Sequence, residues 1–228
     1  MNPTRIGTVT IGQTPRDDVL VEIKSLISTN IEIVEKGALD TLTVEEIADL
    51  RPAKDDEILI TRMSDGTELT VGRDHILPRM QDAISELDRD KDVALITLLC
   101  SGEFPVFECS KPLITPFRLF WGALASISIE GSLGMMLPSR EQVKTTVETF
   151  EGLGCKVVGV GASPYGKEEE IVRVAKELKG RVDLVFMNCF GYSLEMKRIV
   201  RQITGKPVIL ARSLLARTLD ELLHGCCE

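Results

Sequence analysis

The sequence predicts an α/β fold of two pseudo-symmetric lobes, each a parallel sheet flanked by helices, with an active cleft between the lobes. Apolar strands alternate with amphipathic helices along the 228 residues. This alternation restarts after a proline-rich segment at 103–117. Two strands also end in the same Cys-x-Gly pattern, at Cys100 and Cys189. These three observations together favour two similar lobes over one continuous sheet.

The composition is that of an ordinary globular protein, with 43% hydrophobic and 27% charged residues. A net charge of −8 disfavours non-specific nucleic-acid binding. No run of about 18 apolar residues occurs, and the N-terminus lacks the apolar stretch of a signal peptide. The 6 cysteines are scattered, which is atypical of a disulfide scaffold. We therefore expect a reduced, cytoplasmic protein with neither nucleic-acid nor membrane partners.

The first lobe is expected to comprise residues 1–112 and a C-terminal helix that returns to it within 211–228. Its opening strand at 5–12 leads into a helix at 14–27, with Thr14 as N-cap, Pro15 at the first helical position and Asp17 at the capping-box position. The later elements are a strand at 31–39, a helix at 42–50 capped by Thr43 and Glu46, a hairpin at 57–72 turning at Asp65–Gly66, a helix at 73–89 and a strand at 92–100.

The second lobe is expected to span residues 113–210, after a crossing between lobes at 103–117. Ser139 and Gln142 form a capping-box pattern, and Gly154 and Gly205 are helix stop signals. The expected strands are 131–138, 156–163, 183–189 and 207–211, and the expected helices are 117–127, 139–154, 165–180 and 192–205. The helix expected at 213–223 is the one that returns to the first lobe.

A degenerate repeat relates the two halves. Each contains a strand, a helix that opens on TPRDDV or PSREQV, and a later strand that ends in CSG or CFG. Arg16 and Arg140 lie in the first turns of the matching helices, shifted by one position. Ligands of parallel sheets bind beyond the carboxyl ends of the strands. Two such lobes facing each other would bring Cys100 and Cys189 to one cleft.

Two thiols suit the inversion of a carbon next to a carboxylate, because a proton must leave one face and another must arrive at the opposite face. A thiol pKa of about 8.5 lies near working pH, so one group can be thiolate and the other thiol. Turns that precede helices supply backbone N–H groups, which favour thiolate and bind carboxylate. Glycine two residues after each cysteine lets the backbone approach a ligand closely.

The motifs TIGQTPR at 10–16, CSG at 100–102, CFG at 189–191 and RSLLAR at 212–217 resemble the AroM family over essentially the whole chain. That family is similar to the aspartate/glutamate racemase superfamily. The resemblance implies a racemase, epimerase or isomerase that uses two cysteines and no cofactor on a small carboxylate-bearing metabolite. Those racemases usually carry Cys-Asn-Thr and Gly-Cys-Thr. Here Ser101 can replace one hydroxyl contact, whereas Phe190 replaces a polar residue, which leaves the substrate open.

We expect Cys100 and Cys189 to be the catalytic acid/base pair. The expected substrate-binding residues are Thr14, Arg16, Ser101, Gly102, Phe190, Gly191 and Ser163. Arg16 could pair with a carboxylate through its planar guanidinium, or it could be a surface arginine beside Asp17. Two other functions stay open: a lyase or isomerase that uses a single cysteine, and a non-catalytic protein that binds a metabolite. A homodimer also stays open.

Three other kinds of site are disfavoured. The glycines of GVGASPYG do not follow the G-x-G-x-x-G spacing of a dinucleotide site. Neither of the 2 histidines sits at a strand-end turn, so a Ser-His-Asp enzyme is disfavoured. His224, Cys226 and Cys227 make a weak metal motif at the chain end, so we expect no metal site.

Overall fold

The computed structural model describes residues 3–54 and 56–224, and the chain divides into two compact units. Unit 1 consists of Met1–Leu20, Ile27–Phe117 and Leu219–Glu228. Unit 2 consists of Val21–Leu26 and Arg118–Thr218. Each unit has its own parallel sheet and its own hydrophobic core.

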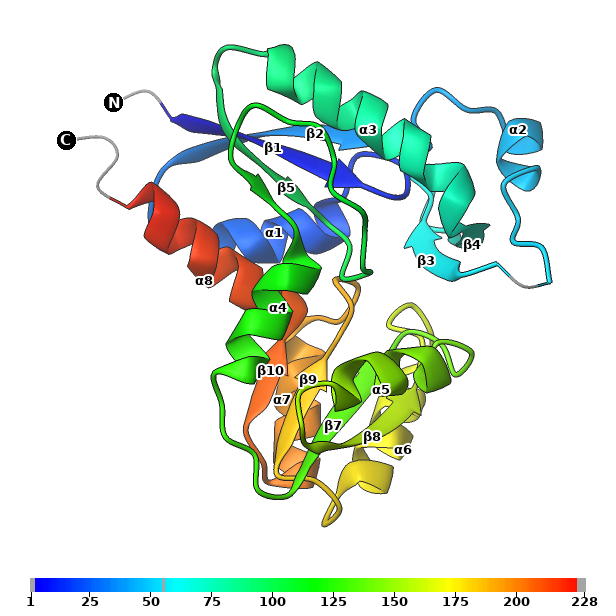
Figure 1. Cartoon of the computed structure of the whole chain (residues 1–228), viewed down its shortest axis with the longest axis vertical. Coiled ribbons are helices and arrows are strands. Elements are labelled where there is room, and N and C mark those ends of the chain that lie inside the picture. Colours follow the sequence, from blue (N-terminus) through cyan, green and yellow to red (C-terminus); the bar gives the residue numbers. More distant parts are fainter. Residues whose placement is uncertain (1–2, 55, 225–228) are drawn as a thin grey trace. The chain divides into compact units, whose positions relative to one another are not determined.

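The sheet of unit 1 has the strand order β2-β1-β5-β6, and all of its pairings are parallel. Its strands are β1 (Thr4–Thr10), β2 (Ile31–Gly37), β5 (Val93–Leu98) and β6 (Leu113–Ile114). Figure 1 shows the long helix α3 (Arg73–Arg89) on one face of this sheet, whereas α1 (Asp17–Ser25) begins in unit 1 and belongs to unit 2 from Val21 onward. The alternation of strand and helix in the sequence thus yields parallel strands joined by crossover segments.

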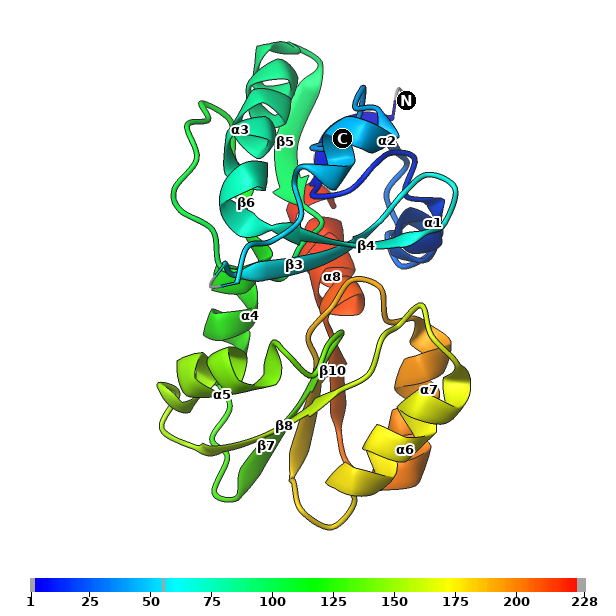
Figure 2. The ribbon, with the colours of Figure 1, turned by 90° about the vertical axis from the view of Figure 1, so that its right-hand side faces the viewer.

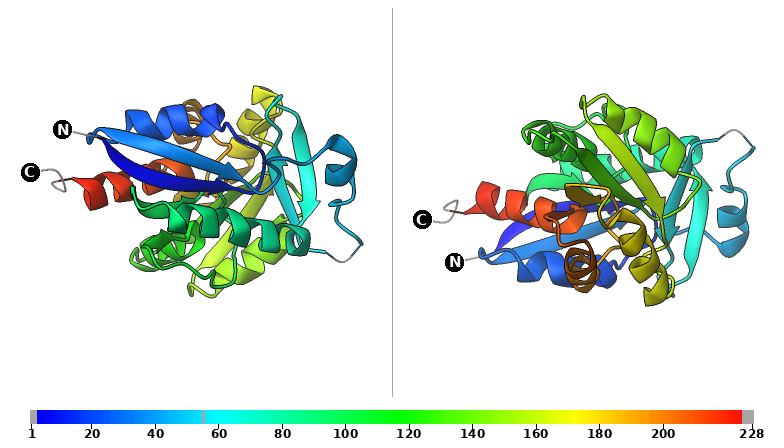
Figure 3. Two further views of the ribbon diagram at one scale, coloured as in Figure 1. Left: turned by 90° about the horizontal axis from the view of Figure 1, so that it is seen from above. Right: turned by 90° about the horizontal axis from the view of Figure 1, so that it is seen from below.

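A hairpin and a short helix extend unit 1 beyond the carboxyl ends of its strands (Figure 3). Strands β3 (Ile58–Arg62) and β4 (Glu68–Gly72) are antiparallel, and the expected turn at Asp65–Gly66 is confirmed. Helix α2 (Val44–Ala48) carries the predicted capping box between Thr43 and Glu46. Leu59 and Val71 of the hairpin are buried in the same core as α3, so the hairpin is an integral part of unit 1.

Unit 2 has a second four-stranded parallel sheet, with the order β10-β9-β7-β8. Figure 2 shows α5 on one face of it, and α6 with α7 on the other. The strands are β7 (Ser132–Leu137), β8 (Lys156–Gly161), β9 (Leu184–Met187) and β10 (Val208–Leu210). The helices are α4 (Pro116–Ala125), α5 (Val143–Glu151), α6 (Glu168–Leu178), α7 (Leu194–Thr204) and α8 (Ala211–Leu223).

The two sheets share one topology. Listed from the edge formed by the second strand of each unit, the orders are β2-β1-β5-β6 and β8-β7-β9-β10. The third strand of each parallel sheet, β5 or β9, is therefore an interior strand, and each of them is followed by a Cys-x-Gly turn. The predicted fold of two similar α/β lobes is confirmed.

Two predicted helix caps are wrong. Helix α1 begins at Asp17, and the Thr14 backbone N–H and hydroxyl both donate to the Asp40 carboxylate, at 2.8 and 2.9 Å. Helix α5 begins at Val143, and its N-cap Gln142 makes no side-chain cap hydrogen bond. Because a carboxylate 26 residues away takes the donors of Thr14, a tertiary partner overrides the local capping pattern.

The unit boundaries differ from the expected ones. The crossing at 103–117 contains β6, the fourth strand of the first sheet, and unit 1 runs on to Phe117. Helix α8 is divided, with its residues up to Thr218 in unit 2 and those from Leu219 in unit 1. Within the described ranges, no helix is both long and apolar enough to cross a membrane.

Candidate active site

Cys100 lies just beyond the carboxyl end of β5, half-buried and not in a disulfide. The Leu99 N–H donates to the Val9 carbonyl at 2.7 Å, which holds this turn beside the end of β1. A side chain added at Gly102 would lie 3.4 Å from Leu59 of the hairpin and 3.6 Å from the Cys100 sulfur. The hairpin, the turn at Gly102 and the thiol are thus neighbours. An irregular segment follows at 103–112, within the predicted crossing, so no helix begins directly after this cysteine.

The loop after β1 is also held by the hairpin. A Cβ at Gly12 would overlap the Thr61 hydroxyl and the Arg62 carbonyl, so only glycine permits this close approach. The Gln13 N–H donates to the Arg62 carbonyl at 3.3 Å, and the side-chain oxygen of Gln13 accepts from the Ser64 N–H at 3.1 Å. This contact explains why the TIGQTPR motif contains a glycine at this position.

Asp40 joins the loop after β1 to the loop after β2. Its carboxylate accepts hydrogen bonds from the Thr14 N–H, the Thr14 hydroxyl and the Gly37 N–H, at 2.7 to 2.9 Å. Thr14 therefore has a structural task at the carboxyl edge of the sheet. Its predicted contact with substrate stays a prediction.

Arg16 is buried, with 4% of its surface exposed, so it is not a surface arginine. Its guanidinium makes a two-pronged ion pair with Asp18, through Nε at 2.8 Å and Nη2 at 2.9 Å. Its Nη1 also donates to the Thr10 hydroxyl at 3.0 Å. The geometry matches carboxylate recognition, but the carboxylate it holds is the chain's own.

Cys189 lies at the carboxyl end of β9, half-buried and not in a disulfide. The Gly191 N–H donates to its sulfur at 3.4 Å. The chain then enters α7, whose N-cap Ser193 accepts from the Met196 N–H at 3.1 Å. A hydrogen bond from a backbone N–H favours the thiolate form of a cysteine.

The loop after β8 packs against the Gly191 turn. A Cβ at Gly191 would lie 2.5 Å from Pro164 and 2.9 Å from the Tyr165 hydroxyl. Ser163 begins this loop, and its hydroxyl accepts from the Tyr165 N–H at 3.1 Å. The structure thus brings the segment around Ser163 next to the Cys189 turn, and its predicted contact with substrate stays a prediction.

Phe190 does not occupy the expected position. Its ring is 3% exposed and packs 6.0 Å from the ring of Phe120, centroid to centroid. Phe120 in turn makes an edge contact with Phe186 of β9 at 5.3 Å. The aromatic side chain belongs to the core of unit 2, which explains why a polar residue is absent here. The backbone of Phe190, rather than its ring, faces the polar groups of the turn.

Arg212 is not among the residues predicted from the sequence, yet it contacts the Cys189 turn. It lies at the start of α8, 1% exposed, and its Nε and Nη2 donate to the Phe190 carbonyl at 3.0 and 2.5 Å. Its Nη1 forms an ion pair with Glu22 at 2.7 Å. The RSLLAR motif contained this arginine, but no local pattern distinguishes a buried arginine from a surface one on a helix.

Tyr192 supports the same turn from within the core. Its fully buried hydroxyl lies between the carbonyl oxygens of Leu137 and Ala162, at 2.6 and 2.7 Å, and its single proton is shared between these two acceptors. Burial, and secondarily the neighbouring Cys189, raise the pKa of this phenol well above its ordinary value. Tyr192 therefore stays neutral and anchors the turn to the ends of β7 and β8.

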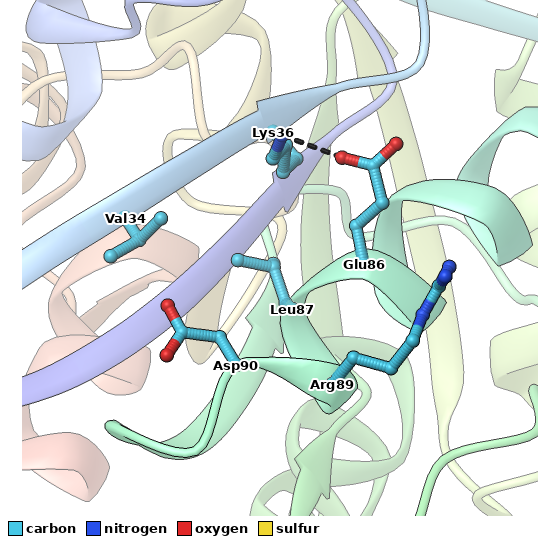
Figure 4. A pocket seen from close by; sticks show the side chains of 6 residues that line it. All are labelled: Val34, Lys36, Glu86, Leu87, Arg89 and Asp90. Carbon is cyan, nitrogen blue, oxygen red and sulfur yellow. Dashed lines mark ion pairs between the residues drawn. The ribbon is translucent and has the colours of Figure 1, made fainter.

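A separate surface pocket of about 420 Å³ lies in unit 1, between β2 and the end of α3 (Figure 4). Its lining mixes charges of both signs, and Lys36 pairs with Glu86 at 2.6 Å. It adjoins Asp90, just before β5 begins, whereas Cys100 follows the end of that strand. The pocket is therefore not part of the Cys100 turn.

No group of three His, Cys, Asp or Glu side chains able to hold a metal ion occurs in residues 3–54 and 56–224. The hypothetical site at His224, Cys226 and Cys227 depends on two cysteines outside the described residues.

The model of one protein family, described as AroM protein, matches residues 6–223. The chain belongs to the AroM family. No curated protein matches it. The matched range includes both Cys-x-Gly turns and the helix that carries Arg212.

Solved structures with the same fold include several enzymes. An aspartate racemase of Picrophilus torridus is 14% identical with a TM-score of 0.63, and 96% of this chain and 94% of that chain are covered. The maleate isomerase Iso of Pseudomonas putida S16 is 13% identical with a TM-score of 0.64, covering 97% and 93%. A glutamate racemase of Aquifex pyrophilus is 18% identical with a TM-score of 0.57, covering 96% and 83%. At these identities the likeness shows the two-lobed α/β fold.

Proposed function

We propose that this AroM protein is a cofactor-independent racemase, epimerase or isomerase that acts on a small carboxylate, with Cys100 and Cys189 as its acid/base pair. The observation that carries the proposal is the equivalence of the two thiols. Each is half-buried, not in a disulfide, and placed at the carboxyl end of the third strand of its parallel sheet. Ligands of parallel sheets bind at that edge.

The chemistry needs only proton transfer. A thiolate removes the proton from the carbon beside the carboxylate, and the electron pair of the broken C–H bond stays on the substrate as a carbanion delocalised into the carboxylate. The other thiol then delivers its proton to the opposite face of that carbon. The thiol and thiolate exchange roles in each turnover, so nothing is oxidised or reduced.

The similar structures support the substrate class. Their names specify aspartate, glutamate and maleate, which are all small carboxylates. We propose that the substrate lies against Thr14, Ser101, Gly102, Ser163 and Gly191. Arg16 and Phe190 contribute less directly, because one already holds Asp18 and the other lies in the aromatic core.

A second candidate is a one-cysteine isomerase or lyase that uses Cys189 alone. The observation that favours it is the polar support of this turn, where Gly191 donates to the sulfur and Arg212 holds the Phe190 carbonyl. On this alternative, Cys100 would only line the site.

The test is hydrogen exchange in D₂O with a panel of small carboxylates, namely both enantiomers of aspartate and glutamate, and maleate. With the amino acids, solvent deuterium should enter the carbon beside the carboxylate, whereas maleate has only alkene carbons there and is followed by its conversion to the trans isomer. Cys100→Ser and Cys189→Ser should each lower inversion at least about a hundredfold, because a hydroxyl is a far weaker acid/base catalyst than a thiol. Cys155→Ser, a half-buried cysteine outside both turns, is the matched control and should leave the rate unchanged.

The alternatives give different results. Loss of activity in Cys189→Ser with full activity in Cys100→Ser would identify the one-cysteine enzyme. Saturable binding of a panel member without exchange or conversion in the wild-type protein would identify a metabolite-binding protein. Sedimentation of the wild-type protein would test the homodimer, which stays a prediction.

A further inference from the structure

A single peptide group separates a buried arginine from the Cys189 thiol. The carbonyl oxygen of the Phe190–Gly191 peptide accepts from Nε and Nη2 of Arg212, at 3.0 and 2.5 Å. The N–H of that same peptide donates to the Cys189 sulfur at 3.4 Å. The guanidinium and the sulfur thus lie at opposite ends of one peptide dipole, within unit 2.

We propose that Arg212 is a positioning residue that favours the Cys189 thiolate through this peptide, by orienting its N–H toward the sulfur and by polarising it. The role rests on the proposed function only in explaining why the protein needs a thiolate at this position. The geometry itself does not depend on what the substrate is.

Arginine suits this task for two reasons. Its guanidinium stays charged at any working pH, and its fork can bind one carbonyl with two N–H groups. A positive charge at the carbonyl end draws electrons toward the oxygen and strengthens the N–H as a donor, as in chains of coupled hydrogen bonds. Because Arg212 is 1% exposed, solvent screens this effect little. Nη2 also lies 3.3 Å from the Gly191 carbonyl, which holds both peptides of the turn.

Glu22 opposes the charge of Arg212. Its Oε2 accepts from Arg212 Nη1 at 2.7 Å and from the Leu194 N–H, in the first turn of α7, at 3.0 Å. The phenols of Tyr192 and Tyr165 also lie at this turn, and Glu195 lies in the first turn of α7. Glu22 therefore both aligns the arginine and partly neutralises it, and these two effects act on the thiolate in opposite directions.

Because Arg212 and Glu22 have opposite effects on the Cys189 thiolate, substituting each of them separately tests the proposal. The variants are Arg212→Gln, which removes the charge and keeps a donor, and Glu22→Gln, which removes the opposing charge and keeps an acceptor for the Leu194 N–H. Arg212→Lys tests rescue by charge alone. Arg217→Gln is the matched control, since Arg217 lies on the same helix and donates to the Leu26 carbonyl at 2.8 Å.

The measurement is the rate of iodoacetamide alkylation of Cys189 between pH 5 and 10, resolved by mass spectrometry of tryptic peptides. Cys155 lies in a different tryptic peptide and serves as the internal reference. Circular dichroism and urea unfolding confirm that each variant is folded.

Arg212→Gln should slow alkylation of Cys189 at pH 7 by about threefold to tenfold, because a thiol pKa higher by one unit gives about one tenth of the thiolate. Arg212→Lys should recover part of that loss. Glu22→Gln should speed alkylation by about twofold to fivefold, which corresponds to a pKa lower by a fraction of a unit. The alkylation rate of Cys155 should not change in any variant. The alkylation rate of Cys189 should not change in Arg217→Gln.

A purely structural role for Arg212 predicts another pattern. Both glutamine variants would then loosen the turn and shift the Cys189 profile in the same direction, and this result would overturn the inference. An unshifted Cys189 profile in folded Arg212→Gln would do so as well. The alkylation profile needs no substrate. A shifted profile without any deuterium exchange would refute the proposed function alone, whereas exchange with an unshifted profile would refute the role of Arg212 alone.

Discussion

The two Cys-x-Gly turns occupy equivalent strand ends but are supported by different kinds of structure. The Cys189 turn leads into α7 and is held by polar groups, namely Arg212 at a carbonyl and the Gly191 N–H at the sulfur. The Cys100 turn leads into irregular chain, and Leu59 of the hairpin packs beside it. Two halves of a repeat can therefore share one strand order while different segments support the equivalent turn in each half. The reason is that the sheet determines only where a strand ends, whereas the following segment determines what surrounds the turn.

Substitution of the turn glycines by alanine should separate the two turns most clearly. A Cβ at Gly191 would lie 2.5 Å from the Pro164 ring, whereas a Cβ at Gly102 would lie at an ordinary 3.4 Å from Leu59. Gly191→Ala should therefore lower the free energy of unfolding by about 2 to 3 kcal/mol through overpacking, measured by urea unfolding.

Gly102→Ala is the matched control and should change the free energy of unfolding by less than about 0.5 kcal/mol, as tolerated substitutions do. Equal costs at the two glycines would contradict the difference in packing between the turns.

Asp40 holds two loops of unit 1 in place, much as Glu22 aligns Arg212 in unit 2. Its carboxylate accepts from the Thr14 N–H, the Thr14 hydroxyl and the Gly37 N–H. Asp40→Asn replaces one acceptor oxygen by a donor, so at least one N–H or O–H loses its partner. We expect a loss of about 1 to 2 kcal/mol in the free energy of unfolding.

Asp49→Asn is the control for this substitution, because Asp49 is an exposed aspartate at the end of α2. It should leave the free energy of unfolding within about 0.5 kcal/mol of the wild-type value. If Asp40→Asn were equally neutral, the carboxylate would not be what joins the two loops.

The smallest expected effect concerns pH and the irregular segment after Cys100. Hydrogen bonds from the Ser110 and Lys111 N–H groups hold the pKa of the Asp88 carboxyl below its usual range, since they outweigh desolvation. A carboxyl with a lowered folded-state pKa contributes stability above its unfolded pKa and loses it as pH falls through the folded value. Below about pH 4, amide hydrogen exchange at Ser110 and Lys111 should therefore accelerate once each rate is divided by the intrinsic exchange rate at that pH.

Two references sharpen this pH measurement. Asp88→Asn should show fast exchange at Ser110 and Lys111 at every pH, and the amides of α7 in unit 2 should show no matching acceleration. Protection of Ser110 that persists to low pH in the wild-type protein would contradict the role of Asp88.

Much of the site's placement could be predicted, because it depends on strand ends. The alternation of strand and helix located the carboxyl edges, and the paired Cys-x-Gly patterns placed Cys100 and Cys189 there. The roles of the other residues were less predictable. Arg16 and Arg212 look alike in sequence as arginines near helix starts, but each is buried against a different carboxylate. A side chain's partner depends on which distant segment packs against it, and local pattern carries no such information.

Hydrophobic periodicity and turn chemistry act over a few residues. They are therefore enough to predict the fold class, the hairpin, the α2 capping box and the positions of the two thiols at strand ends. Three features are visible only in the folded chain. Thr14 forms hydrogen bonds with Asp40 instead of capping α1, and β6 completes the first sheet. Phe190 lies in an aromatic core. The tertiary structure also decided that Arg212 holds the Phe190 carbonyl, 22 residues away along the chain. These outcomes depend on long-range packing, in which a buried donor takes whichever acceptor the folded chain brings to it.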